Sequence, residues 1–108
     1  MTDTVISLIS YTRAQDADGV WRNSVETSRQ VFATADSVTR YEFYNAGRNG
    51  LNPDLRFTVF SGDYEGEEIV EYDGKRYGVY RTYRVPGTDY MELYVERKGG
   101  TNGQKDGD

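Results

Sequence analysis

Apolar and polar residues alternate with a period of two along most of this chain, the pattern that predicts half-buried β-strands. Four segments show it most clearly: residues 5–11, 25–35, 55–60 and 90–96. The predicted buried sides carry Val25, Val31, Ala33 and Ala35 in the second segment, Leu55, Phe57 and Val59 in the third, and Met91, Leu93 and Val95 in the last. In the second segment Arg29 interrupts the apolar face and Phe32 lies on the other side. The chain is therefore predicted to be mainly β.

The strongest local signal is the dipeptide Asp73-Gly74 between two strand-like runs. Asp-Gly is a preferred pair for the two-residue type I′ turn, and a loop of that length fixes the register of a hairpin. The predicted register places Tyr72 opposite Lys75, Glu71 opposite Arg76 and Val70 opposite Tyr77. Charge agrees with it, because residues 62–73 carry six carboxylates and no base, whereas residues 74–88 carry four bases and no acid.

One short helix is predicted over residues 38–46, with Asp36-Ser37 as its N-cap and Gly47 as its C-cap. Residues 47–54 contain two Gly, two Asn and a proline, which predict a long exposed loop. Further turns are predicted at Asp18-Gly19, at residues 61–63 and at Pro86-Gly87.

The order strand, strand, short helix, long loop, strand, hairpin and strand suits a small antiparallel β-barrel of OB-like or SH3-like size. Residues 1–97 are expected to form this single domain. Residues 98–108 consist of glycine and polar or charged residues, and they predict a flexible polar C-terminal tail.

Composition excludes several classes of function. The 108 residues include no Cys and no His, so a thiol nucleophile, a Ser-His-Asp triad, a histidine base and the usual zinc sites are ruled out. A net charge of −5 disfavours non-specific nucleic-acid binding by the chain as a whole. No apolar stretch approaches the roughly 20 residues that span a bilayer, so no membrane partner is expected. We expect no enzymatic activity, hence no catalytic residue, and no cofactor or metal.

The acidic residues of the hairpin region are of the type that binds Ca²⁺ or Mg²⁺. They are Asp63, Glu65, Glu67, Glu68, Glu71 and Asp73. Strand spacing, however, sends Glu67 and Glu71 to one face and Glu68 to the other, which favours a solvated strand over a metal site. An acid–base hydrolase that uses the carboxylates of residues 65–71 is a remote alternative.

Tyrosine is unusually frequent, with ten copies. Five of those in the C-terminal half are of particular interest: Tyr77, Tyr80, Tyr83, Tyr90 and Tyr94. Together with Arg76, Arg81 and Arg84 they would suit an OB-like single-stranded nucleic-acid binder, in which bases stack on aromatic rings. The other interpretation is that these tyrosines form the core and rim of a small barrel or a wet protein interface.

An ordered set of short runs extends along the chain from Val5 to Val95. It comprises Asp18-Gly19-Val20-Trp21, Val31-Phe32-Ala33, Ser37-Val38, Tyr41-Glu42-Phe43-Tyr44-Asn45-Ala46, Gly50-Leu51-Asn52-Pro53, Phe57-Thr58-Val59, Asp63-Tyr64-Glu65-Gly66-Glu67, residues 70–83 and Met91-Glu92-Leu93-Tyr94. This pattern resembles the head-closure family of long-tailed bacteriophages, the stopper or head-tail joining proteins. It consists of common residues in order and contains no invariant catalytic motif.

The resemblance implies a virion structural protein at the head-tail interface, assembled in the host cytoplasm. Its small β-barrel would form a homo-oligomeric ring beneath the portal and adaptor proteins, with packaged double-stranded DNA at the channel. A long loop from each subunit would close the channel until ejection, and the opposite side of the ring would receive the tail or a tail-terminator protein. A tail-completion or adaptor protein of the same assembly is the alternative.

The channel-closing loop implied by the resemblance falls on the turn-rich passage already identified. It holds Asn45, Gly47, Arg48, Asn49, Gly50, Leu51, Asn52 and Pro53. Arg40, Arg48 and Arg56 flank or occupy it and are expected to face DNA phosphates, with solubility or pairing between subunits as the alternative.

Overall fold

The computed structural model describes residues 2–15, 17–19 and 21–97, with the backbone alone described for residues 12–15 and 21–25. Its strands are β1 (Thr2–Gln15), β2 (Trp21–Ser37), β3 (Pro53–Phe60), β4 (Ile69–Tyr72), β5 (Lys75–Arg84) and β6 (Tyr90–Arg97). A helix α1 (Arg40–Gly47) precedes β3, and a 3₁₀ helix η1 (Ser61–Asp63) follows it. The predicted tail at residues 98–108 lies outside the described residues.

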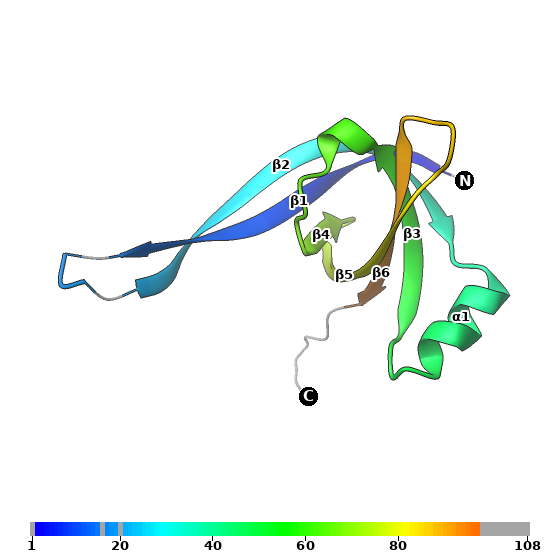
Figure 1. The fold of residues 1–108 in the computed structure, drawn as a ribbon, viewed down its shortest axis with the longest axis horizontal. Helices are drawn as coiled ribbons and strands as arrows, with labels where there is room; N and C mark the ends of the chain where they lie inside the picture. The colour runs from blue at the N-terminus through cyan, green and yellow to red at the C-terminus, as the bar shows by residue number, and fades with distance from the viewer. Residues whose placement is uncertain (1, 16, 20, 98–108) are drawn as a thin grey trace.

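The six strands close into an antiparallel barrel in the order β1-β2-β3-β6-β5-β4, and β4 pairs with β1 to complete it (Figure 1). The closure depends on three residues of β1, Ser7 to Ile9, that pair with β4. The prediction of a small, mainly β barrel with one short helix is confirmed.

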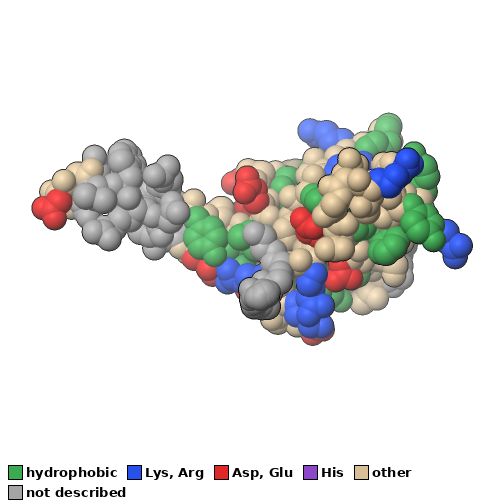
Figure 2. Space-filling model, turned by 90° about the horizontal axis from the view of Figure 1, so that it is seen from below, with side chains coloured by type: hydrophobic (Ala, Val, Ile, Leu, Met, Phe, Trp, Pro, Cys, Tyr) green, Lys and Arg blue, Asp and Glu red, His purple; other side chains and the backbone are tan. Residues whose placement is uncertain are grey.

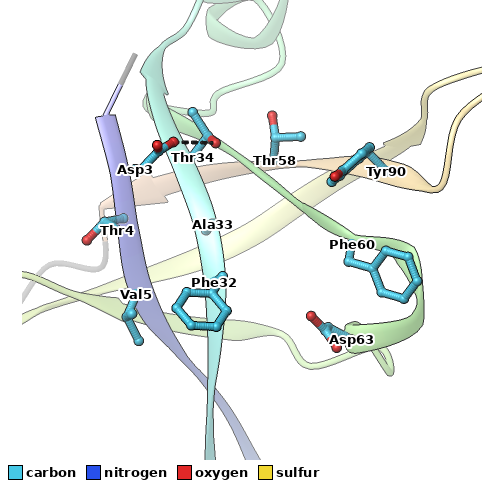
Figure 3. Close-up of a pocket in the computed structure, with 10 residues that line it drawn as sticks. All are labelled: Asp3, Thr4, Val5, Phe32, Ala33, Thr34, Thr58, Phe60, Asp63 and Tyr90. Atoms are coloured by element: carbon cyan, nitrogen blue, oxygen red, sulfur yellow. Dashed lines mark hydrogen bonds between the residues drawn. The ribbon is translucent and has the colours of Figure 1, made fainter.

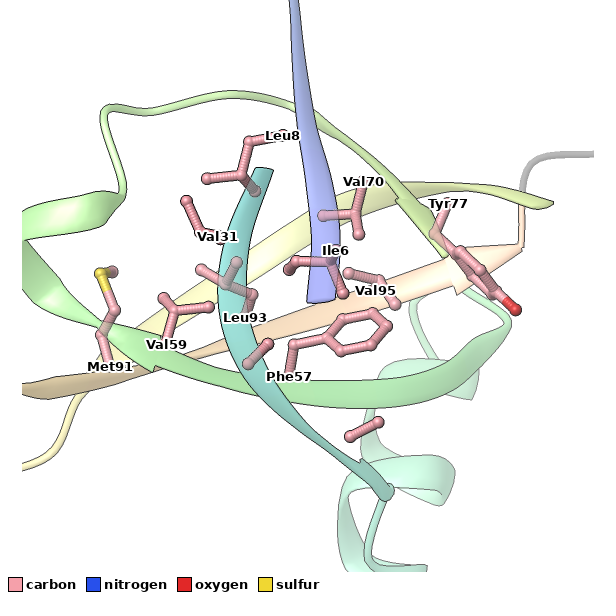
Figure 4. Close-up of a cluster of buried hydrophobic side chains, with 12 residues drawn as sticks. Ile6, Leu8, Val31, Phe57, Val59, Val70, Tyr77, Met91, Leu93 and Val95 are labelled. Atoms are coloured by element: carbon pink, nitrogen blue, oxygen red, sulfur yellow. The ribbon is translucent and has the colours of Figure 1, made fainter. Parts of the chain in front are cut away.

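Inward-facing side chains from every strand fill the barrel (Figure 4). Phe57 of β3 is fully buried and makes edge-to-face contacts with Tyr72 and Tyr77, at ring-centroid distances of 5.2 and 6.3 Å. Most of the predicted inward positions are buried as expected: Val31, Ala33 and Ala35 of β2, Phe57 and Val59 of β3, and Met91, Leu93 and Val95 of β6. The side chain of Val25, also predicted to be inward, lies outside the described part of the structure. Leu55 is half-buried and packs against this core. Phe32 points outward as predicted and is exposed.

The hairpin prediction at Asp73-Gly74 is confirmed in register. Tyr72 pairs with Lys75, Glu71 with Arg76 and Val70 with Tyr77. Both turn residues have positive φ, 54° at Asp73 and 75° at Gly74, which is the backbone of a type I′ turn.

The β1–β2 hairpin is much longer than the alternating pattern predicts. Beyond Ile9, β1 pairs only with β2, and its partners there are the residues of β2 up to Thr27, so the described backbone of this part is a two-stranded ribbon. We call residues 10–15 and 21–27 the arm. It projects from the barrel along the molecule's 49 Å axis, with its turn near Asp18-Gly19 at the far end (Figure 1).

The helix exists, but its predicted caps are wrong. Asp36 and Ser37 belong to β2 and pair with Arg56 and Leu55, so they are unavailable to the helix. The N-cap is Thr39, whose side chain accepts a hydrogen bond from the backbone N–H of Glu42. At the other end Gly47 stays within the helix and Arg48 is the C-cap, with Gly50 taking the left-handed conformation at φ 79°.

The predicted loop over residues 47–54 is also shorter than expected. Gly47 lies in α1, and Pro53 and Asp54 lie in β3, which leaves residues 48–52 as the connection. Pro53 is buried, not exposed. The turn predicted at residues 61–63 is the 3₁₀ helix η1, and the Pro86-Gly87 turn is confirmed, with Gly87 at φ 76°.

Candidate functional site

The residues predicted to form a channel-closing loop are folded into the end of α1 and a tight connection. Asn45 and Gly47 lie within the helix, and Pro53 begins β3. The backbone N–H groups of Asn49 and Leu51 both donate to the carbonyl of Ala46, at 3.0 and 3.2 Å. The side chain of Asn49 donates to the carbonyl of Asn45 at 3.2 Å. In this structure the segment is therefore compact and held by its own backbone.

One carboxylate fastens α1 to the outside of the barrel. Glu42 is buried, and it accepts hydrogen bonds from the hydroxyl of Tyr80 at 2.7 Å and from Nη2 of Arg81 at 2.6 Å. Burial alone would raise the pKa of Glu42, but these two hydrogen bonds outweigh it and lower that pKa. The guanidinium of Arg81 also lies 4.0 Å from the centroid of the Tyr94 ring, as a cation–π contact.

A β-bulge makes this attachment possible. The pairing of β5 with β6 shifts between Val79 and Arg81, so Tyr80 is the extra residue. A bulge re-aims side chains that regular alternation would send to opposite faces. As a result the consecutive residues Tyr80 and Arg81 both reach Glu42.

The opposite face of α1 presents aromatic and basic side chains to solvent. Tyr41, Phe43 and Tyr44 are exposed, Tyr41 by 79% and Tyr44 by 63%. Arg40 and Arg48 stand at the two ends of this face, and both are exposed. In the space-filling view, hydrophobic side chains and Lys or Arg side chains share the surface of the barrel end of the molecule (Figure 2).

The three arginines predicted to face DNA divide into two kinds. Arg40 and Arg48 make no ion pair within the described part of the chain. Arg56 lies on the outer face of β3 and contacts two carboxylates, Asp36 at 3.4 Å and Glu92 at 3.8 Å. Its charge is thus already balanced by its own subunit.

The tyrosines proposed as a base-stacking platform do not share a surface. Tyr77 points into the barrel core, and Tyr94 is buried beside Tyr80 and Arg81. Tyr90 lies elsewhere, edge-to-face with Phe60 at 6.4 Å. The arginines of that hypothesis are also dispersed, since Arg81 binds Glu42 and Arg76 binds residues of the arm.

Arg76 connects the β4–β5 hairpin to the base of the arm. Its guanidinium donates to Glu26 at 2.9 and 3.0 Å and to the Tyr11 hydroxyl at 3.0 Å, and its Nε donates to Glu71 at 3.3 Å. The hydrogen bonds to Glu26 are the main reason that the pKa of Arg76 is raised. The cluster thus joins side chains of β1, β2, β4 and β5 where the arm leaves the barrel.

The acidic run contains a buried carboxylate in an ion pair, which the interpretation as a solvated strand did not anticipate. Because β4 begins only at Ile69, Glu67 precedes the strand, and it is buried rather than solvated. Arg29 donates to it through Nη2 at 2.6 Å and Nε at 3.1 Å, and also to the carbonyl of Asp63. The sequence signal was the charge of Arg29 on an otherwise apolar face, since such a charge requires a partner. No group of His, Cys, Asp or Glu in the described residues is arranged to hold a metal ion.

A shallow pocket of about 560 Å³ opens on the outer surface where β2 and β3 part (Figure 3). The last paired residues are Ala33 and Val59, and beyond them β2 continues into the arm while β3 ends at η1. Val5, Phe32, Phe60 and Tyr90 provide apolar walls, and Asp3 and Asp63 contribute carboxylates. Sequence analysis did not find this pocket, because it arises from the divergence of two strands.

Neither a scan against protein-family models nor a search of curated proteins finds a match to this sequence. In the part of the chain that the structure describes, no helix combines the length and the apolar character needed to cross a membrane.

Proposed function

We propose that this chain is a structural subunit of the head-tail connector of a long-tailed bacteriophage, and specifically the head-closure stopper that retains packaged DNA. The proposal is based on the resemblance of the sequence pattern from Val5 to Val95 to the head-closure family. The subunit would act by binding its neighbours, without catalysis, in a ring between the portal or adaptor proteins and the tail.

The observation that carries the proposal is the arm. A two-stranded hairpin is marginally stable in water by itself, and an unpaired strand edge is a template for pairing with another chain. In the described residues, β1 beyond Ile9 and β2 before Ala33 each have one free edge. Such a ribbon suits a subunit whose neighbours complete its packing in an assembly.

The channel-closing role is proposed for the segment between α1 and β3. Because residues 48–52 are folded compactly here, closing a channel would require this connection to project together with the end of α1. Arg40 and Arg48, at the two ends of the helix, would then be the arginines nearest the channel. Arg56 is omitted from this role because it is paired with Asp36 and Glu92.

The decisive experiment is a DNA-retention assay on portal-bearing, DNA-filled heads that lack their closure protein. Addition of the purified chain is expected to prevent loss of DNA, measured as nuclease-sensitive DNA over time. Two variants test the elements. One replaces residues 12–25 of the arm with an Asn-Gly turn, and the other carries Arg48→Ala, Asn49→Ala and Leu51→Ala while keeping Gly50.

Both variants are expected to fold and to retain less DNA than the wild-type chain, whereas Lys75→Ala, at the exposed first residue of β5, should behave as wild type. Heads that leak despite added, folded wild-type protein would contradict the stopper role. If such heads nevertheless join tails, the chain is a tail-side connector. Micromolar binding of an oligonucleotide with a steep salt dependence would instead support the single-stranded nucleic-acid binder.

A further inference from the structure

Two unpartnered surfaces of this chain have matching composition. The first is the exposed face of α1, where Arg40, Tyr44 and Arg48 succeed one another at a spacing of four residues and Phe43 lies beside them. Residues four apart lie on one face of a helix. This surface is therefore aromatic in the middle with a guanidinium at each end, separated by about 12 Å along the axis at about 1.5 Å per residue.

The second surface is the pocket between β2 and β3. Phe32 is 81% exposed, and Val5, Phe60 and Tyr90 are each about half exposed, so the pocket is an unusual concentration of uncovered apolar area. Asp3 and Asp63 lie toward opposite ends of the pocket (Figure 3). The pocket therefore combines apolar walls with a carboxylate toward each end.

Two other charges next to these surfaces are paired within the subunit. Glu42, the acidic residue of α1, is buried against the barrel and bound to Arg81. Near the pocket, the charge of Arg29 is compensated by Glu67. The helix face is positively charged through the guanidinium groups of Arg40 and Arg48. The pocket is negatively charged through the carboxylates of Asp3 and Asp63.

A helix cannot fill the pocket of its own subunit. The connection from α1 enters β3 at Pro53, whereas the pocket lies at the Phe60 end of that strand. At about 3.3 Å per residue, these two ends are about 23 Å apart. The bonds of Glu42 to Tyr80 and Arg81 also hold α1 in place.

From this complementarity we propose that α1 of one copy docks into the β2–β3 pocket of a second copy. Phe43 and Tyr44 pack against Phe32 and Phe60, while Arg40 and Arg48 pair with Asp3 and Asp63. Because the two surfaces differ and lie on different parts of the molecule, the contact is head-to-tail, the kind that generates a ring when its rotation closes. The inference deepens the proposed function by identifying the surfaces that would join neighbouring subunits.

Cross-linking tests the contact directly, because the natural chain has no cysteine. Tyr44→Cys and Phe32→Cys single variants are mixed at high protein concentration and treated with a short bis-maleimide. We expect a heterodimer at about tenfold the yield obtained when Lys75→Cys replaces either partner. A yield equal to that control overturns the docking.

Charge reversal provides the second, independent measurement. Arg40→Glu/Arg48→Glu in the Tyr44→Cys chain should lower the yield about tenfold, since two attractive pairs become repulsive, and Asp3→Arg/Asp63→Arg in the Phe32→Cys chain should do the same. Mixing the two reversed chains should restore the yield. Loss without restoration overturns the pairing and instead fits arginines that bind DNA or another protein.

The experiments distinguish failure of the stopper role from failure of the contact between α1 and the β2–β3 pocket. Heads that retain DNA with a chain whose cross-links stay at the control level preserve the stopper role and exclude this contact. Specific, charge-rescued cross-links from a chain that does not retain DNA preserve the contact and exclude the stopper role.

Discussion

At the scale of single residues, the pair Arg29 and Glu67 shows how a buried charge is accommodated. Glu67 also accepts a hydrogen bond from the backbone N–H of Glu65 at 2.9 Å, and Tyr64 donates to the Glu67 carbonyl at 2.6 Å. Removing the charge with Glu67→Gln should therefore cost about 1–3 kcal/mol of unfolding free energy at neutral pH, less than for a fully buried pair because Arg29 is partly exposed. Urea unfolding monitored by circular dichroism measures this loss.

The same substitution should change how stability depends on pH. Burial raises the pKa of Glu67, but the hydrogen bonds from Arg29 and from backbone N–H groups outweigh it, so the pKa lies below its usual value of 4.5. A group with a lowered folded pKa stabilises the protein above its unfolded pKa and loses that contribution as pH falls through the folded value. Wild type should thus lose more stability than Glu67→Gln below about pH 4.5. Glu68→Gln, at an exposed neighbouring position, should keep the wild-type slope, and parallel slopes for all three chains would refute the assignment.

At the scale of elements, α1 depends on tertiary contacts because eight residues are too few for a stable isolated helix. Glu42→Gln removes the charge that Tyr80 and Arg81 bind, and hydrogen bonds to a charged group contribute about 1.5–3 kcal/mol. We expect the amides of residues 44–48 to exchange about tenfold faster, measured by hydrogen exchange, with the strands of the barrel unchanged. Glu96→Gln is the control, at a carboxylate that among the described residues accepts a hydrogen bond from the backbone N–H of Asn52 and does not contact Tyr80 or Arg81. Equal protection of α1 in both variants would show that Glu42 does not hold the helix.

The elements that sequence analysis predicted well are those specified by near neighbours. The register at Asp73-Gly74 follows from a two-residue turn, and the buried side of β6 follows from simple alternation. The N-cap was misplaced because Asp36 and Ser37 pair with β3, a partner about 20 positions away that local propensity does not report. Local sequence also does not report three other features, each of which depends on a distant partner. They are the ion pair of Arg29 with Glu67, the bulge at Tyr80 and the closure of β1 on β4. The alternating pattern also underestimated the length of the arm. The strands β1 and β2 continue beyond the barrel, where no core buries one of their faces and alternation is not required.

At the scale of the whole molecule, a closed barrel leaves no free strand edge in its own wall, so the proposed assembly would use features added to the barrel. The described residues form three such features, the arm, the aromatic face of α1 and the β2–β3 pocket. A polar cluster centred on one residue lies beside each feature. Arg76 binds Glu26 at the base of the arm, and Glu42 binds Arg81 under α1. Arg29 binds the carbonyl of Asp63 in η1, next to the pocket. A rigid barrel with separately anchored surfaces can present a fixed geometry to several neighbours at once.

This division predicts two levels of stability in the isolated chain. The amides that pair only within the arm should exchange at least tenfold faster than those of β3 and β6, since a two-stranded ribbon opens without disturbing the core. Replacing residues 12–25 with an Asn-Gly turn should therefore leave the urea midpoint of the barrel unchanged. If the amides of the arm instead exchange as slowly as those of the barrel, the arm is stable without a neighbouring subunit and does not need one to complete its packing. Protection of the arm that appears only in assembled connectors would show that the neighbour supplies the missing packing.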